Sequence, residues 1–201
     1  MSVAIVDYGM GNLRSVSKAC ERLGAATNIV ETPDAVEGAE RLIVPGVGAF
    51  GDAMQELDRR GLVDAIRRYA RSGRPVLGIC LGLQIFFDTS EEAPGVAGLS
   101  LLPGTVRRFR SDSLKIPHMG WNRLDVRRSS RLLGSLDAEP FVYFVHSYYV
   151  IPQDDAVIAA TAEYGIPFVA AVERDALFGV QFHPEKSQQT GLEILRRFLS
   201  I

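Results

Sequence analysis

Cysteine and histidine are scarce in this chain of 201 residues, which has two of the first and three of the second. Neither occurs at Cys-x-x-Cys or His-x-x-x-His spacing, so the sequence predicts no metal site. No apolar run approaches the roughly 18–20 residues of a membrane helix. The first residues lack the basic segment and cleavage site of a signal peptide. We therefore expect a cytoplasmic protein, in which a disulfide between Cys20 and Cys80 would not form.

The chain also lacks a large excess of charge of either sign. A formal net charge of -2 gives no electrostatic reason to expect nucleic acid or a membrane surface as a partner. The chain is long enough for one well-buried domain and short for two. Because no repeat, low-complexity tract or linker divides it, we expect residues 1–201 to form a single domain.

Short apolar segments alternate with amphipathic ones in the first half of the chain. This alternation predicts a parallel sheet with helices on both faces, a flavodoxin-like open α/β fold. The expected strands are 3–7, 26–30, 41–44 and 76–79, and the expected helices are 13–23, 54–70 with a break near Gly61, and one beginning at Gln84.

The second half has shorter apolar runs and more turn residues, which predicts an antiparallel extension of the sheet. We expect residues 117–122 to be a loop, 173–176 to be a hairpin turn, and a C-terminal helix at 190–199 to place Leu192, Leu195 and Phe198 inward. The expected strands are 106–109, 121–126, 141–145, 156–161, 168–172 and 177–182.

The segment 78–82 has the pattern Gly-x-Cys-x-Gly between a predicted strand and a predicted helix. This is the nucleophile-elbow pattern with cysteine in place of serine. A sharp strand-to-helix turn would present the Cys80 sulfur to solvent, and the first amides of the helix would favour its thiolate. A buried structural cysteine is the alternative interpretation.

A histidine at a strand end supplies a candidate base. His183 follows the strand 177–182, and Glu185 lies two positions on, with a restraining proline between them. Glu185 can accept a hydrogen bond from one ring nitrogen of His183 while the other faces the sulfur. An exposed His-Pro turn is the alternative.

The segment 45–48, Pro-Gly-Val-Gly, follows another buried strand. Its glycines allow the amide of Val47 or Gly48 to point at a reacting carbonyl, and the amide of Leu81 is a second candidate donor for an oxyanion hole. By itself this segment also fits an ordinary strand-to-helix turn.

Five segments carry a resemblance that covers essentially the whole chain: 7–12, 78–84, 117–122, 143–148 and 179–187. The elbow, the glycine-rich loop and His-Pro-Glu together resemble the class I (triad) glutamine amidotransferases. The segment 117–122, Pro-His-Met-Gly-Trp-Asn, is similar to the glutaminase subunits of imidazole glycerol phosphate synthases within that family.

The resemblance implies a glutaminase with Cys80 as nucleophile, His183 as base and Glu185 as the residue that orients the imidazole. Hydrolysis of glutamine would proceed through a glutamyl thioester on Cys80, and no cofactor is implied. Besides Gly48, five residues match positions that line the glutamine pocket of the family: Gln84, Glu92, His146, Ser147 and Tyr148. For His146 and Tyr148, packing at a strand end is an equal alternative.

The resemblance also implies a partner chain. Free ammonia becomes ammonium in neutral water, so the family passes it through a closed channel to a (β/α)8-barrel cyclase, forming a heterodimer. The cyclase makes imidazole glycerol phosphate and aminoimidazole-carboxamide ribonucleotide in histidine biosynthesis. Residues Asn12, Met119, Trp121 and Lys186 match segments that face it, although Trp121 also fits a core position.

Three other functions remain open from the sequence. The chain fits the glutaminase of another synthase, such as one making pyridoxal phosphate, in which case another partner would stimulate glutamate release. It also fits a stand-alone cysteine hydrolase of flavodoxin-like fold, which would need no partner. The chain also fits a non-catalytic binding module, whose function would not change measurably when Cys80 is replaced by alanine.

Overall fold

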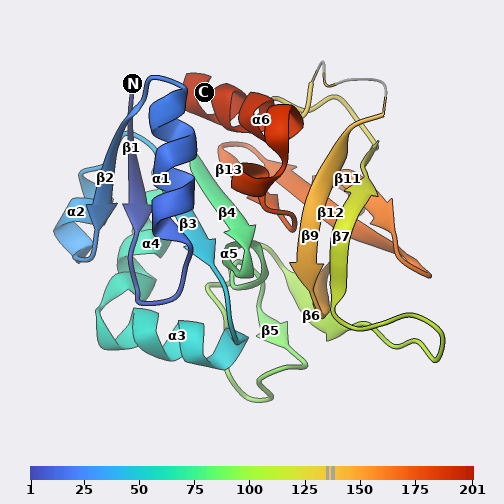
Figure 1. Ribbon diagram of the computed structural model, residues 1–201. Helices are drawn as coiled ribbons and strands as arrows, with labels where there is room; N and C mark the ends of the chain where they lie inside the picture. Colours follow the sequence, from blue (N-terminus) through green and yellow to red (C-terminus); the bar gives the residue numbers. More distant parts are fainter. Residues whose placement is uncertain (135, 137–138) are drawn as a thin grey trace.

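Strands and helices alternate through the first half of the protein, whose computed structural model describes residues 1–134, 136 and 139–201 (Figure 1). The elements of this half are β1 (Ser2–Val6), α1 (Leu13–Arg22), β2 (Ala26–Val30), α2 (Pro33–Glu37), β3 (Leu42–Gly46), α3 (Phe50–Arg59), α4 (Leu62–Arg71), β4 (Val76–Cys80), α5 (Leu81–Gln84) and β5 (Thr89–Ser90).

The second half consists mainly of strands. These elements are β6 (Gly104–Arg108), β7 (His118–Arg123), β8 (Asp125–Val126), β9 (Phe141–His146), β10 (Tyr148–Pro152), β11 (Ile158–Glu163), β12 (Pro167–Arg174), β13 (Leu177–Val180) and the C-terminal helix α6 (Gln188–Ser200). Short 3₁₀ turns lie at Asp155–Val157 and Pro184–Lys186.

The described residues form a central sheet of eight strands in the order β2-β1-β3-β4-β13-β12-β11-β8. Neighbouring strands from β2 to β13 are parallel, and those from β13 to β8 are antiparallel. The predicted fold class, a mostly parallel sheet with an antiparallel C-terminal extension, is confirmed. Strand β13 comes late in the chain yet pairs with β4 in the middle of the sheet, and this pairing positions the site.

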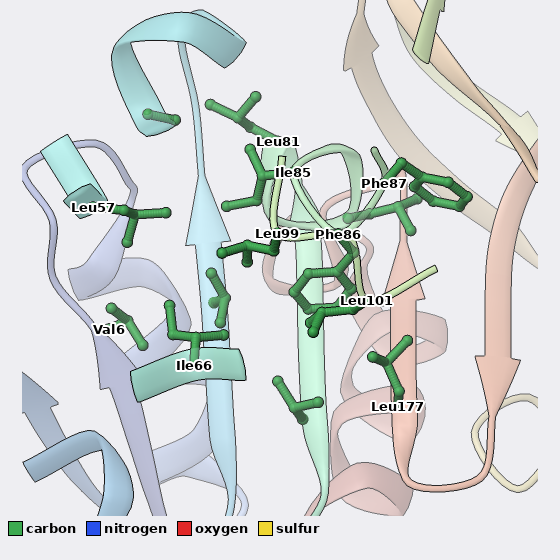
Figure 2. Close-up of a cluster of buried hydrophobic side chains, with 14 of the residues drawn as sticks. Val6, Leu57, Ile66, Leu81, Ile85, Phe86, Phe87, Leu99, Leu101 and Leu177 are labelled. Atoms are coloured by element: carbon green, nitrogen blue, oxygen red, sulfur yellow. The ribbon is translucent and has the colours of Figure 1, made fainter. Parts of the chain in front are cut away.

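Alternate side chains of the central strands enter two cores, one on each face of the sheet. On β3, Leu42 and Val44 belong to the core that includes residues of α3 and α4, whereas Ile43 belongs to the core of α1 and α6. This separation follows from the two-residue period of a strand. Figure 1 shows α1 and α6 together over one face, and Figure 2 shows part of the other core, where Leu57 and Ile66 face the sheet. Helices therefore cover both faces, as predicted.

Two small sheets lie outside the central one, and the sequence did not predict them. Strands β10, β6 and β5 form one, and the antiparallel pair β7–β9 forms the other. The register of the pair places Trp121 opposite Tyr143 and His118 opposite His146.

The helix predicted to begin at Gln84 is wrong, because α5 ends at that residue. The chain turns away there, and the carbonyl of Ile85 accepts a hydrogen bond from Leu99 N at 2.7 Å, while that of Phe86 accepts one from Leu101 N at 2.8 Å. These longer-range bonds satisfy backbone groups that a continued helix would have paired internally.

The loop predicted at 117–122 is also wrong, because residues 118–123 form β7. The strand predicted at 121–126 is confirmed in part: it begins earlier, at His118, and it is interrupted at the buried Leu124 before the two-residue β8. Strand β7 keeps a two-residue alternation of exposure along its length, but its less exposed positions are His118, Gly120 and Asn122. Its apolar side chains, Met119 and Trp121, are the exposed ones, so hydrophobicity does not reveal the strand.

The strand predicted at 156–161 begins at Ile158 and ends at Glu163. Its predicted first residues form the 3₁₀ turn instead, because the Asp154 carboxylate accepts a hydrogen bond from Ala156 N at 2.9 Å and caps that turn.

Two helical predictions can be compared residue by residue. The break near Gly61 is confirmed, and that glycine has a φ of 67°, which separates α3 from α4. In α6, Leu195 and Phe198 are buried as predicted, but Leu192 is half-buried and Ile194 takes the inward position. None of the helices in the described ranges is both long and apolar enough to cross a membrane.

Candidate active site

Cys80 occupies a sharp corner between a strand and a helix. It is the last residue of β4, it has a φ of 55°, and α5 begins at the next residue. A positive φ for a residue other than glycine costs of the order of 1–3 kcal/mol and is typical of functional sites. The geometry is that of the predicted nucleophile elbow.

The glycines of the elbow are required by close backbone contacts. A Cβ at Gly82 would lie 1.8 Å from the carbonyl oxygen of Val44 on β3, and one at Gly78 would lie 2.7 Å from the carbonyl oxygen of Gly82. No side chain fits at either position, so α5 packs directly against the strands beneath it. This close packing keeps Cys80 at the edge of the sheet.

The pairing of β13 with β4 brings His183 to the same edge. Val180 pairs with Ile79 in the parallel register, and His183 follows three residues later (Figure 1). The amide of His183 donates to the carbonyl of Tyr143 at 2.9 Å, which anchors the turn against β9. Its Nδ1 lies 2.8 Å from Glu185 Oε1, and both side chains are almost fully buried.

The surroundings of His183 favour its protonated form. Burial alone would lower the pKa of the imidazole, but the Cys80 sulfur and the Glu185 carboxylate outweigh it and raise the pKa to about 10. His183 Nε2 is buried and makes no hydrogen bond to the residues that the structure describes. The imidazole is therefore oriented through Nδ1, and Nε2 is left for proton transfer.

Most of the predicted site residues line one cavity of about 410 Å³. Cys80, His183 and all five predicted glutamine-pocket residues line it, as does Lys186. Glu185 lies behind His183 and is not part of the lining. A larger cavity of about 690 Å³ lies beside β8 and has neither cysteine nor histidine in its lining.

The predicted oxyanion segment borders this cavity. Gly46 on β3 pairs with Cys80 on β4, so Val47 and Gly48 follow directly beside the sulfur, and both line the cavity together with Leu81. Gly48 has a φ of 103°, a conformation that favours glycine. Leu81 is the first residue of α5, where an amide has no partner within the helix.

Tyr8 anchors the segment 45–48 through a hydrogen bond. Its buried hydroxyl donates a 2.7 Å hydrogen bond to the carbonyl of Pro45. Burial, followed by the neighbouring Cys80, raises the pKa of Tyr8, so the hydroxyl stays protonated and remains a donor. Tyr8 was not among the site residues predicted from the sequence.

A buried hydrogen-bond network begins at the nucleophile. Gln181 Nε2 lies 3.6 Å from Cys80 Sγ, and Gln84 Nε2 donates to both Gln181 Oε1 and the Tyr148 carbonyl at 3.1 Å. His146 Nδ1 lies 2.8 Å from that same carbonyl. Gln181 was not among the site residues predicted from the sequence, although a polar residue inside an apolar segment is a signal that could have identified it.

The network continues through a pair of buried histidines. His118 Nδ1 lies 3.0 Å from His146 Nε2. Burial lowers the pKa of His118 to about 4 and that of His146 to about 3, so both rings are neutral at neutral pH. Because the Tyr148 carbonyl can only accept, His146 carries its proton on Nδ1, and its Nε2 accepts from His118.

The remaining predicted residues are placed as follows. Glu92 Oε2 accepts a 2.8 Å hydrogen bond from Phe50 N at the start of α3, and its carboxylate lines the cavity. Met119 and Trp121 are 62% and 47% exposed on β7. Trp121 is therefore a surface residue, and the alternative core position is wrong.

Asn12 and Lys186 lie on different elements, and only Lys186 lines the cavity. Asn12 directly precedes α1, and its carbonyl accepts from Val16 N at 3.2 Å, whereas Lys186 is exposed at the cavity and its Nζ lies 5.9 Å from the centre of the Tyr143 ring. Asn12, Met119 and Trp121 are not part of the cavity lining.

Both cysteines are free thiols. Cys20 is fully buried on the inward face of α1, and burial raises its pKa to about 12, whereas Cys80 lines the cavity. Within the described ranges, no group of three or more Cys, His, Asp or Glu side chains is arranged to hold a metal ion.

Comparison with known proteins identifies relatives along the whole chain. The model of the family "Glutamine amidotransferase class-I" matches residues 4–201. The imidazole glycerol phosphate synthase subunit HisH of Syntrophotalea carbinolica is 52% identical over 202 residues, covering 98% of each chain. That of Moorella thermoacetica is 52% identical over 196 residues, covering 98% of this chain and 93% of the relative.

Solved structures show the same fold at lower identity. PurLQS from Thermotoga maritima has a TM-score of 0.80 at 20% identity, covering 99% of this chain and 97% of that one. A crystal structure of a glutamine amidotransferase has a TM-score of 0.77 at 22% identity, covering 98% and 97%. At these identities the likeness is one of fold.

Proposed function

We propose that this chain, which belongs to the glutamine amidotransferase class-I family, is the glutaminase subunit of an imidazole glycerol phosphate synthase in histidine biosynthesis. The observation that carries the proposal is that Cys80 and His183 line one cavity, with the Glu185 carboxylate 2.8 Å from His183 Nδ1 behind it. This arrangement occurs in a chain that is 52% identical, over nearly its whole length, to HisH subunits.

The proposed chemistry is acyl transfer to sulfur. The Cys80 thiolate attacks the side-chain carbonyl carbon of glutamine, the carbon–nitrogen bond breaks, and the His183 imidazolium gives its proton to the leaving ammonia. Water then loses a proton to His183 and attacks the thioester carbon. The carbon–sulfur bond breaks and Cys80 returns as thiolate. The carboxylic acid that forms loses its proton to solvent and leaves as glutamate. Glu185 fixes the imidazole through its 2.8 Å contact with Nδ1.

Main-chain amides are the proposed stabilisers of the negative oxygen that forms in both steps. Those of Val47, Gly48 and Leu81 are assigned to this role because all three residues line the cavity around the Cys80 sulfur. Loss of one such donor typically costs about 10²–10³ in rate.

The glutamine pocket is assigned to the far side of the same cavity. The Glu92 carboxylate suits the α-ammonium group of the substrate, and main-chain groups around Ser147 suit its α-carboxylate. Gln84, His146 and Tyr148 complete the lining. Gln84 Nε2 and His146 Nδ1 both hydrogen-bond to the Tyr148 carbonyl, and these two bonds fix the arrangement of the pocket wall.

The proposed partner is the cyclase subunit of the synthase, in a heterodimer. Ammonia released from glutamine beside Cys80 must reach the cyclase before it enters bulk water and is protonated to ammonium. Met119 and Trp121 offer an exposed apolar pair on β7 of the kind that anchors protein interfaces. Asn12 and Lys186 are assigned to the same contact. We place the chain in the cytoplasm as a single domain, residues 1–201.

The test measures glutamate release from glutamine by the chain alone, with the cyclase, and with the cyclase and its nucleotide. Cys80→Ala should abolish glutamine-dependent synthesis while added ammonium still supports synthesis by the cyclase. The matched control is Cys20→Ala, which removes the other thiol, outside the cavity, and should retain activity. Failure of ammonium to rescue Cys80→Ala would contradict the proposed division of labour.

The same assay separates the other candidate functions. A stand-alone hydrolase would turn over without the cyclase and would not prefer glutamine. The glutaminase of another synthase would not respond to this cyclase. A binding module would be unaffected by Cys80→Ala.

A further inference from the structure

Gln181 is a fully buried polar side chain beside the nucleophile. It follows β13, its amide donates to the carbonyl of Ala170 at 2.9 Å, and its side chain is 0% exposed. The flanking Val180 and Phe182 are also fully buried. An uncharged amide at such a position is costly unless both of its ends are hydrogen-bonded, and one of its two ends contacts the Cys80 sulfur.

The orientation of the Gln181 amide follows from one main-chain carbonyl. The carbonyl of Tyr148 can only accept, so Gln84 must turn its NH2 group toward it. The same NH2 group also meets Gln181, so the atom of Gln181 that faces Gln84 must be the oxygen. The NH2 group of Gln181 is then the end that faces Cys80 Sγ, at 3.6 Å.

The sulfur therefore has two polar neighbours, one hydrogen-bond acceptor and one hydrogen-bond donor. The carbonyl of Val145 lies 3.9 Å from Cys80 Sγ and can accept a hydrogen bond from a thiol but repels a thiolate. Gln181 can donate to a thiolate, which accepts more strongly than a thiol. The donor favours the ionised sulfur and directs it, while the acceptor favours the protonated one.

We propose that Gln181 is a positioning residue for Cys80, which holds the sulfur in its reactive direction and stabilises it as thiolate through the Nε2–H group. The inference rests on the proposed function and names a residue to which that function assigns no part. The thiolate is present before attack on glutamine and again after release of glutamate. The Nε2–H group therefore stabilises the thiolate both before the attack on glutamine and after the release of glutamate. Gln84 acts on Gln181 by fixing which end of the amide faces the sulfur.

The test compares the pH dependence of Cys80 alkylation in the full-length chain and in Gln181→Met, which has similar length but no N–H donor. Iodoacetamide is the probe, and modification is followed by mass spectrometry of the peptide that contains Cys80. We expect the midpoint of the alkylation profile to rise by about one pH unit, so that the rate at low pH falls about tenfold. The kcat for glutamate release with the cyclase should also fall about tenfold, with KM changed less than about threefold.

A second variant separates the donor from the support of Gln84. Gln181→Glu keeps an oxygen for the NH2 group of Gln84 but brings a carboxylate to the sulfur, so the midpoint should rise at least as far as in Gln181→Met. The matched control is Ser130→Ala, which removes a buried hydrogen bond to Glu173 outside the cavity. It should lower the melting temperature and leave the alkylation profile unchanged.

An unchanged midpoint in folded Gln181→Met would overturn the inference. If both variants fail to fold, the wild-type chain decides: the side-chain NH2 signal of Gln181 in ¹H–¹⁵N spectra should shift as Cys80 titrates, and a signal that does not follow that titration overturns the inference equally. A wild-type chain that releases no glutamate with any cyclase would refute the proposed function, whereas the alkylation result depends only on the sulfur and its neighbour.

Discussion

Acidification from pH 7 to pH 5 should destabilise this protein through the buried pair His118 and His146. The two side chains are only 3% and 5% exposed, and burial lowers their pKa values to about 4 and about 3. In the unfolded chain a histidine titrates near 6.5. Above that pH both states are neutral. Below it the unfolded state binds protons that the folded state does not, so stability falls until the folded pKa values are reached.

The size of the effect follows from these values. At pH 5 the unfolded histidine lies 1.5 units below its pKa of about 6.5, which is worth about 2 kcal/mol for each residue or about 4 kcal/mol for the pair. His183 has the opposite sign, because its folded pKa is raised and its contribution is lost as pH rises above 6.5. Between pH 7 and pH 5 it regains less than about 1 kcal/mol. The expected net loss is about 3 kcal/mol, or about 6–12 °C in melting temperature.

Urea unfolding at pH 7, 6 and 5 measures this loss. The chain has only three histidines, so few other groups titrate in the window. The informative variant is His118→Gln/His146→Gln, whose amides can donate and accept but do not titrate. It should be less stable at pH 7, because the His118 ring stacks on Tyr164 at a centroid distance of 4.1 Å. It should lose no stability between pH 7 and pH 5.

Two results would refute this reasoning. A wild-type protein as stable at pH 5 as at pH 7 would show that the pair is not held neutral. A double variant that loses as much stability as the wild type would show that other groups cause the loss.

Three further substitutions test the elbow, the triad and the proposed interface. Gly82→Ala places a methyl group 1.8 Å from Val44 O and should destabilise the protein by about 3 kcal/mol or more in urea unfolding. Glu185→Gln removes the carboxylate 2.8 Å from His183 Nδ1 and should lower glutaminase activity by about 10²-fold or more, measured as glutamate release with the cyclase. Trp121→Ala, at a side chain 47% exposed, should change the free energy of unfolding by less than about 1 kcal/mol and weaken cyclase binding about tenfold or more in titration calorimetry.

Each of these has a contradicting outcome. Wild-type stability in Gly82→Ala would mean that α5 does not press on β3 as described. Full activity in Glu185→Gln would remove the orienting role of the carboxylate, and a melted Trp121→Ala would indicate that the ring is needed for folding.

The sequence was informative wherever structure is determined locally. The elbow 78–82 is readable because a buried strand, two glycines and a cysteine are contiguous, and the position of His183 is readable because it ends another apolar strand. The meeting of Cys80 and His183 was predicted from the family resemblance, because the sequence alone placed the strand 177–182 in the antiparallel extension. The structure shows that β13 is parallel to β4, and the ends of parallel strands meet at one edge of a sheet.

Features that depend on distant pairing were not predictable. Strand β7 is stabilised by β9, and its own residues have no continuous hydrophobic pattern. The contact of Gln181 with Gln84 joins residues 97 positions apart, so nothing local indicates which polar side chain will face the sulfur. The turn after Gln84 likewise depends on hydrogen bonds from the segment that begins at Leu99.

Strand β13 lies in the middle of the sheet but is translated late, which affects how the chain folds during its synthesis. Until residues 177–180 have left the ribosome, β4 has a partner only on its β3 side, and its other edge is an apolar template open to any extended peptide. The nascent chain therefore carries an aggregation-prone strand edge for about half of its translation, from the synthesis of β4 to that of β13. The same insertion completes the catalytic pair, so the thiol acquires its base only in a nearly finished polypeptide.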